Sequence, residues 1–182
     1  TPVCSSAASD VYKRQLPILL EDGTIQTKTF EYIPALYNIF NEILVNARDQ
    51  IIRLQQNKSK NPVTCLKITI DKETGLITIF NDGEGIDVAE HPTEKDKKGK
   101  PIMIPEMIFG HLLTSTNYEK DEKKIVGGKN GYGAKLTNIF SQYFKLETLD
   151  SSRGLKYSQT FEDNMKDRGK PKVSKNSGKS YT

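Results

Sequence analysis

The chain has 182 residues, of which 35% are hydrophobic and 27% are charged. This length suffices for one domain with its own core, and no apolar run approaches a membrane span, so we expect a soluble protein without a membrane partner. The net charge of +4 is only a mild basic excess, and the two cysteines have no C-x-x-C spacing, which argues against a disulfide framework and a zinc site.

The first residues differ from the rest of the chain. Residues 1–15 are rich in small polar side chains and have no sustained periodicity, and residues 4–15 resemble translated adaptor sequence. We therefore predict that residues 1–15 are a non-native or disordered leader and that the domain spans residues 16–182. Two short apolar runs in residues 16–30 flank Asp22-Gly23, which predicts a hairpin or an extended arm.

Residues 34–56 carry the most regular helical pattern. The segment opens on Pro34, which suits a first helical turn, and apolar residues recur at helical spacing through it. Glu42, Asn46 and Asp49 fall at i, i+4 and i+7 and line one edge of this helix. A solvated polar face is one interpretation. A functional edge is the other, and it is favoured because Asn and Asp are poor residues for a helix interior.

Two alternating, β-branched runs at residues 65–71 and 76–80 predict an antiparallel hairpin with one buried face. The hairpin runs into the motif Asn81-x-Gly83-x-Gly85. A simple turn would explain this motif. Alternatively, the Asn81 side chain holds the exocyclic amine of an adenine while the glycine backbone packs close to the base.

The middle of the chain alternates charged and apolar segments. Residues 90–100 are dense in charge and predict a solvated loop. Residues 104–113, with Pro105 near their start, predict a short helix. Residues 114–133 form a long connection of the kind that acts as a lid over a ligand.

The last third predicts a helix at residues 133–142 and a second hairpin at residues 144–149 and 155–161. From Lys166 onward the chain turns basic. We interpret this tail as a solvated connection between strands, and a contact with a phosphate backbone is the alternative.

Four glycines lie between Gly127 and Gly133, directly before a predicted helix. Glycines have no Cβ, so successive N–H groups can converge on a phosphate, and a helix start adds its own N–H groups. A P-loop fits badly because Gly133 is followed by Ala134-Lys135 without a hydroxyl residue, and a kinase loop lacks its downstream catalytic motifs. Taken alone, the stretch is either a phosphate site or a mobile surface loop.

Three motifs, which we call boxes, therefore stand in order along the chain. They are Glu42-x-x-x-Asn46-Ala47-x-Asp49, Asn81-x-Gly83-x-Gly85, and Gly127-Gly128-x-Asn130-Gly131-x-Gly133-Ala134. Together they resemble the GHKL (Bergerat-fold) ATPases, the family of gyrase, the large heat-shock chaperone, histidine kinases and MutL. The closer resemblance, which covers residues 30–172, is to the ATPase domain of eukaryotic-type (type IIA) DNA topoisomerase II. It implies an α+β fold, a two-layer α/β sandwich whose mixed, mainly antiparallel sheet carries helices on one face.

The resemblance also implies roles for individual residues. Glu42 would orient and deprotonate the attacking water, Asn46 would ligate Mg²⁺ on the phosphates of ATP, and Asn81 would meet the adenine amine beside Gly83 and Gly85. The other nucleotide contacts that it implies are Asp49, Ser115, Thr116, Asn117, Gly128, Lys129, Asn130, Gly131, Tyr132, Gly133, Ala134 and Lys135.

At the level of the whole protein, the resemblance implies an ATP-driven isomerase that passes one double-stranded DNA through another and closes as a homodimer through its ATPase gate. It implies a nuclear location for a cellular eukaryotic source, and the host-cell cytoplasm or the virion for a viral one. The family would continue beyond residue 182 with further strands, a transducer domain and the DNA-cleaving parts. Two other functions stay open: another GHKL class, such as a chaperone or a MutL-like repair clamp, and a basic nucleic-acid-binding module whose glycine loop is only flexible.

Overall fold

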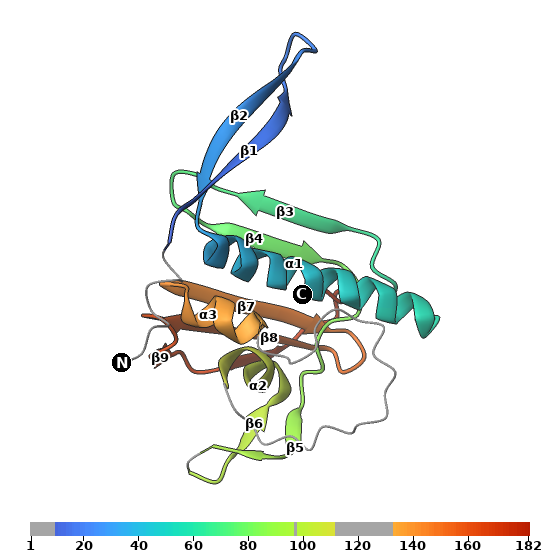
Figure 1. Ribbon diagram of the computed structural model, residues 1–182. Helices are drawn as coiled ribbons and strands as arrows, with labels where there is room; N and C mark the ends of the chain where they lie inside the picture. The colour runs from blue at the N-terminus through green and yellow to red at the C-terminus, as the bar shows by residue number, and fades with distance from the viewer. Residues whose placement is uncertain (1–9, 97, 112–132) are drawn as a thin grey trace. The chain divides into compact units, whose positions relative to one another are not determined.

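The structure is a computed structural model that describes residues 10–96, 98–111 and 133–182. The chain divides into two compact units, residues 1–41 and residues 42–182. Figure 1 shows the order of the helices and strands along the chain. Helix α1 (Pro34–Gln56) begins in the first unit and continues through the start of the second, with the bounds that the apolar periodicity predicts.

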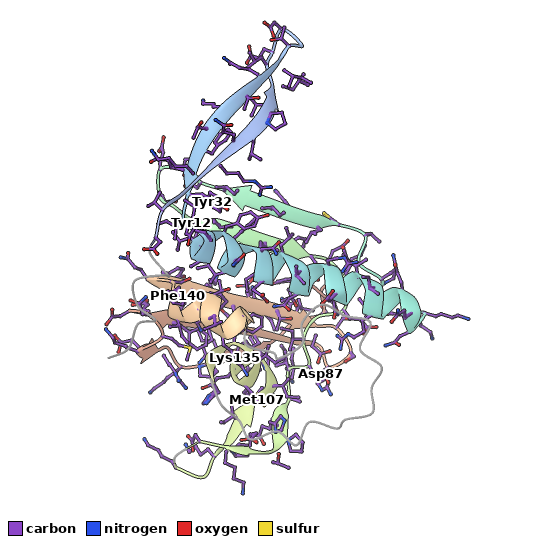
Figure 2. All side chains as sticks on the ribbon, in the orientation of Figure 1. Tyr12, Tyr32, Asp87, Met107, Lys135 and Phe140 are labelled. Carbon is purple, nitrogen blue, oxygen red and sulfur yellow. The ribbon has the colours of Figure 1, made fainter. Side chains whose placement is uncertain are left out.

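The first unit contains an antiparallel hairpin of β1 (Tyr12–Leu19) and β2 (Ile25–Tyr32), in which Tyr12 lies opposite Tyr32 (Figure 2). In its turn the Asp22 carboxylate accepts the Thr24 N–H at 2.9 Å, and Gly23 has a φ of 82°, which favours glycine. The predicted hairpin is confirmed. Its first strand begins at Tyr12, within the proposed leader, and the non-native origin of residues 1–15 stays a prediction.

The second unit contains two antiparallel sheets that position the site. The β3–β4 hairpin consists of β3 (Leu66–Ile70) and β4 (Ile77–Asn81). The larger sheet has the order β10–β8–β7, with β9 also paired to β8, and consists of β7 (Tyr143–Asp150), β8 (Leu155–Glu162), β9 (Asp167–Arg168) and β10 (Lys172–Lys175). All strand pairs in the described part of the chain are antiparallel.

Residues 181 and 182 join these two sheets. Tyr181 forms an antiparallel bridge with Leu149 of β7, with N···O distances of 2.9 and 3.3 Å. The next residue, Thr182, exchanges main-chain hydrogen bonds with Asn81 of β4, at 2.8 and 3.0 Å. The end of β4 is therefore tied to the larger sheet through this two-residue segment.

Of two short helices in the second unit, α2 (Ile104–Gly110) packs against the larger sheet and α3 (Gly133–Ile139) packs against α2 (Figure 1). A Cβ on Gly110 would lie 2.7 Å from the ring of the buried Phe161 on β8, so only glycine allows α2 this close to the sheet. The core beneath contains Val88, Leu146 and Tyr157. The arrangement confirms the predicted α+β fold and both predicted helices.

Three local predictions are wrong. Residues 90–100 form strand β5 (Glu90–Lys95), which pairs with β6 (Pro101–Met103), because Asp96 accepts two main-chain N–H groups in the connecting turn. The basic tail is not only a connection, since it supplies β9 and β10. The β3–β4 hairpin does not bury a face in full: Ile70 is 58% exposed and Ile77 is 47% exposed, because alternation fixes which side chains share a face but not what covers it.

Candidate functional site

A cavity of about 1000 Å³ lies in the second unit, between α1, α2, the start of α3 and the segment that follows β4. Its volume is typical of small-molecule sites, and its lining is partly apolar, including Ala47, Ile79 and Ile86. The polar groups that line it include Glu42, Asn46, Gln50, Asn81 and Thr182.

The α1 wall of the cavity carries Glu42, Asn46 and Gln50 at i, i+4 and i+8. At 100° per residue, Asn46 and Gln50 lie about 40° and about 80° round the helix from Glu42, whereas Asp49 lies about 20° in the opposite direction. Asp49 accordingly does not line the cavity, and its carboxylate lies 3.5 Å from the guanidinium of Arg48. The polar edge of the helix therefore faces a cavity. The third polar residue of α1 that lines this cavity is Gln50, and not the predicted Asp49.

Gln50 joins α1 to the segment after β4. Its Nε2 donates to the carbonyl of Glu84 at 3.1 Å, and its Oε1 accepts from Arg53 at 2.5 Å. The Glu84 carboxylate in turn accepts a hydrogen bond from the Ser59 hydroxyl. Sequence reasoning missed Gln50 as a site residue, although the i, i+4, i+8 row was a signal for it.

Gly133 brings the first and third boxes into contact. A Cβ at this position would lie 2.0 Å from Oε2 of Glu42 and 2.9 Å from the Cβ of Glu42. Only a glycine therefore allows the first turn of α3 to lie against the Glu42 side chain. Ala134, the next residue, also lines the cavity.

Asn81, the last residue of β4, also lines the cavity. It is 7% exposed, and its Oδ1 is buried without a hydrogen-bond partner among the described residues. Thr182, paired with it through the main chain, lines the cavity beside it. Sequence reasoning missed Thr182, since no motif marks it and its place depends on pairing across a hundred residues.

The glycines of the second box serve close packing inside the protein. A Cβ on Gly85 would lie 2.2 Å from the carbonyl oxygen of Leu149, and one on Gly83 would lie 2.4 Å from Val63. Gly85 lines the cavity, whereas Gly83 does not. The motif is therefore more than a simple turn, but at both glycines the close neighbour is the protein itself.

The remaining predicted site residues fall into two groups. Lys135 on α3 does not line the cavity, and burial lowers the pKa of its ammonium group. The others lie outside the described residues: Ser115, Thr116, Asn117, Gly128, Lys129, Asn130, Gly131 and Tyr132.

Comparison with known families identifies the class of this domain. The profile of the histidine kinase-, DNA gyrase B- and HSP90-like ATPases matches residues 31–166, which is more than half of the chain. The chain belongs to this family of ATPases.

Within the family, the chain is similar to type II DNA topoisomerases. It is 47% identical over 162 residues to DNA topoisomerase 2 of Acanthamoeba polyphaga mimivirus, which covers 89% of this chain and 12% of the relative. It is 43% identical over 174 residues to human DNA topoisomerase 2-alpha, which covers 95% of this chain and 10% of the relative. The chain thus spans about a tenth of the length of these relatives.

Solved structures agree with the sequence comparison. The ATPase region of Saccharomyces cerevisiae topoisomerase II, bound to ICRF-187 (dexrazoxane), superposes with a TM-score of 0.77 at 44% identity, covering 94% of this chain and 43% of that chain. These relatives favour a topoisomerase ATPase region over a chaperone or a repair clamp. No helix within the described ranges is both long and apolar enough to cross a membrane.

The residues of the cavity fit the ATP that this family implies. The unsatisfied acceptor on Asn81 needs a donor such as the exocyclic amine of adenine. Ala47, Ile79 and Ile86 supply apolar lining for a flat base. Also on α1, Asn46 offers an amide oxygen, which is a kind of ligand that Mg²⁺ binds, and Glu42 offers a carboxylate.

Proposed function

We propose that this chain is the part of a type IIA DNA topoisomerase that binds and hydrolyses magnesium-ATP. The observation that carries the proposal is the contact between Glu42 and Gly133, because it places a carboxylate at the start of the helix that follows the glycine box. In the same cavity, Asn81 has a buried acceptor that an adenine amine would satisfy. The same cavity thus offers a group that suits a base and a group that suits phosphoryl chemistry.

In this proposal the residues of α1 divide the chemistry between them. Glu42 takes the proton of the attacking water as general base, and Asn46, one turn later, would hold Mg²⁺. Mg²⁺ supplies neutralisation of the charge that develops on the phosphoryl oxygens. Asn81 orients the base, and Gly85 lets the cavity wall pack closely on β7.

The other predicted contacts complete the proposed site. Residues 115–117 contact the ribose and the phosphates, and residues 128–134 wrap the triphosphate. Asp49 and Lys135 do not line the described cavity, so we assign them indirect roles.

For the whole protein we propose ATP-driven passage of one double-stranded DNA through another, by a homodimer that closes through this domain. A cellular eukaryotic source would place the protein in the nucleus, and a viral source in the host-cell cytoplasm or the virion. The similarity to DNA topoisomerases 2 supports this proposal.

Titration calorimetry with a non-hydrolysable ATP analogue and Mg²⁺ tests the nucleotide site. We expect one analogue bound per chain, and a loss of affinity when Mg²⁺ is removed. Absence of binding by the folded protein would instead favour a basic nucleic-acid-binding module with a flexible glycine loop. An ATP-dependent DNA relaxation assay on the full-length protein separates a topoisomerase from a chaperone or a repair clamp.

A further inference from the structure

Thr148 is a fully buried hydroxyl residue on β7, behind the wall of the cavity. Its side chain is 0% exposed, and the residue does not line the cavity. Its Oγ1 accepts the N–H of Ile86 at 2.9 Å, donates to the carbonyl of Tyr181 at 2.9 Å and lies 2.8 Å from Oγ1 of Thr182. One hydroxyl thus contacts three groups, two of which belong to cavity-lining residues.

The three contacts determine which hydroxyl is the donor. A threonine hydroxyl has one hydrogen and two lone pairs. The N–H of Ile86 uses one lone pair of Thr148, and the carbonyl of Tyr181 uses its hydrogen. Only a lone pair is left for Thr182, so the Thr182 hydroxyl must donate to Thr148. The Thr182 oxygen then has only lone pairs to offer a further partner.

This donor assignment gives the part of the cavity beside Asn81 two acceptors, the Thr182 hydroxyl oxygen and Oδ1 of Asn81. Thr182 and Asn81 are paired through their main chains, and Oδ1 of Asn81 is an acceptor with no partner within the described ranges. Two acceptors side by side match the two hydrogens of an exocyclic amine. They repel a carbonyl oxygen at the same position, because that oxygen has no hydrogen to donate.

We propose that Thr148 is a positioning residue that fixes Thr182 as an acceptor and thereby makes the site select a 6-aminopurine over a 6-oxopurine nucleotide. The inference rests on the nucleotide-binding function proposed above. Thr148 itself need not touch the ligand, because it acts through the proton of Thr182.

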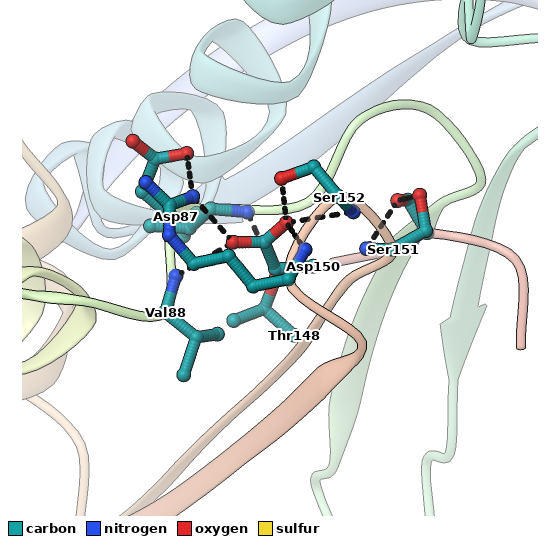
Figure 3. A network of polar contacts seen from close by, with 9 residues as sticks. Asp87, Val88, Thr148, Asp150, Ser151 and Ser152 are labelled. Atoms are coloured by element: carbon teal, nitrogen blue, oxygen red, sulfur yellow. Dashed lines mark hydrogen bonds and ion pairs between the residues drawn. The ribbon is translucent and has the colours of Figure 1, made fainter. Parts of the chain in front are cut away.

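The surroundings of Thr148 keep the three contacts in place. Two residues further along β7, the Asp150 carboxylate accepts the N–H of Val88 at 3.1 Å, so alternate side chains of β7 hold alternate N–H groups of the wall (Figure 3). Arg153 donates to Asp150 at 2.7 Å and to the cavity-lining Asp87 at 3.0 Å. The wall therefore has two side-chain anchors on β7.

Gly85 adds a steric limit to these anchors. Its α-carbon packs so closely on β7 that an added Cβ would lie 2.8 Å from Oγ1 of Thr148. The backbone just before Ile86 therefore lies directly against β7, where the Ile86 N–H meets Thr148 at 2.9 Å.

Calorimetry with the imido analogues of ATP and of inosine triphosphate tests the proposal, since these ligands differ only in the group at position 6 of the purine and in the hydrogen that N1 carries in the 6-oxopurine. We expect the protein to prefer the ATP analogue, and Thr148→Val to reduce the ratio of the two affinities about tenfold, the worth of one buried hydrogen bond. Thr148→Ser keeps the hydroxyl and should keep the ratio. The matched control is Thr160→Val, a half-buried threonine on the neighbouring strand β8 that does not line the cavity.

The ratio separates positioning from folding, because partial unfolding lowers the number of sites for both ligands equally. An unchanged ratio in Thr148→Val, or a ratio lost in Thr148→Ser, would overturn the proposal. If Thr148→Val does not fold, Thr182→Val takes its place, and equal losses of affinity for both ligands would also overturn it. If the folded protein binds neither analogue, the nucleotide site itself is wrong. If it binds both equally well, only the role of Thr148 is wrong.

Discussion

Replacing Gly133 by alanine would place a methyl group where the Glu42 carboxylate now lies. The new Cβ would be 2.0 Å from Oε2 and 2.6 Å from Cδ of Glu42. The end of the Glu42 side chain can rotate away, whereas its Cβ, 2.9 Å from the new methyl group, requires a small shift of α3, so we expect Gly133→Ala to displace the general base.

The size of the displacement gives the size of the effect. An ordinary carbon contact begins at 3.4 Å, so Oε2 must move by at least the difference from 2.0 Å, which is 1.4 Å. Misplacing a reacting group by about 1 Å can cost about a hundredfold in rate. We therefore expect kcat for ATP hydrolysis to fall about a hundredfold, with the affinity for a non-hydrolysable analogue within about threefold of the wild type.

Steady-state hydrolysis and calorimetry on the same preparation measure the two quantities. The double variant Gly133→Ala with Glu42→Ala should be no slower than Glu42→Ala alone, because both changes remove the same group. A Gly133→Ala protein with wild-type kcat would refute the reasoning.

Three further outcomes follow from the site and its supports. Glu42→Ala should abolish hydrolysis and spare binding of a non-hydrolysable analogue, and surviving turnover would mean that another group is the base. Gly85→Ala would place a Cβ 2.2 Å from the Leu149 carbonyl, so we expect urea unfolding to show a loss of about 2 kcal/mol. Burial opposes ionisation of Asp150, but hydrogen bonds from neighbouring hydroxyl, guanidinium and N–H groups outweigh it and lower its pKa to about 2. Because this pKa is lower in the folded state than in the unfolded state, the ionised Asp150 carboxylate stabilises the fold fully above pH 3.8, and this contribution is lost as the pH falls toward 2. Asp150→Asn should therefore lower the free energy of unfolding at neutral pH by about 2 kcal/mol.

Controls for these changes come from the same chain. Asp167→Asn replaces an exposed carboxylate on β9 and should leave the acid dependence of unfolding unchanged. If Asp150→Asn unfolds with the same acid dependence as the wild type, Asp150 is not the group that titrates. A Gly85→Ala protein of wild-type stability would show that β7 can move aside.

The sequence predicted those parts of the fold that depend on local pattern. The bounds of α1 follow from apolar spacing and Pro34, and the β7–β8 hairpin follows from alternation. The β5–β6 hairpin was missed because its strands are short and charged, and their pairing depends on a turn that Asp96 stabilises. The prediction that one face of the β3–β4 hairpin is buried is wrong at Ile70 for a similar reason. Burial of a strand residue depends on which other segments pack against the strand, and alternation does not determine this.

The site divides in the same way. Glu42, Asn46 and Asn81 could be named in advance because their residue types and spacing within each box are chemically distinctive. Thr148 and Thr182 could not, because an ordinary threonine in a strand acquires its role only when a segment 34 residues away pairs beside it. Long-range pairing is therefore the part of the site that local pattern does not predict.

The join between the β3–β4 hairpin and the larger sheet has a consequence for the ligand. Asn81 belongs to one sheet, and Thr182 is tied through Tyr181 to the other, so a base held by both would act as a non-covalent cross-link across the join. A ligand at a hundred times its Kd adds about 2.7 kcal/mol to the folded state, and here that free energy would resist separation of the two sheets. The amide hydrogens of Asn81, Leu149 and Thr182 should then exchange more slowly together when nucleotide is bound, and cohesion between the sheets would rise and fall with occupancy of the site.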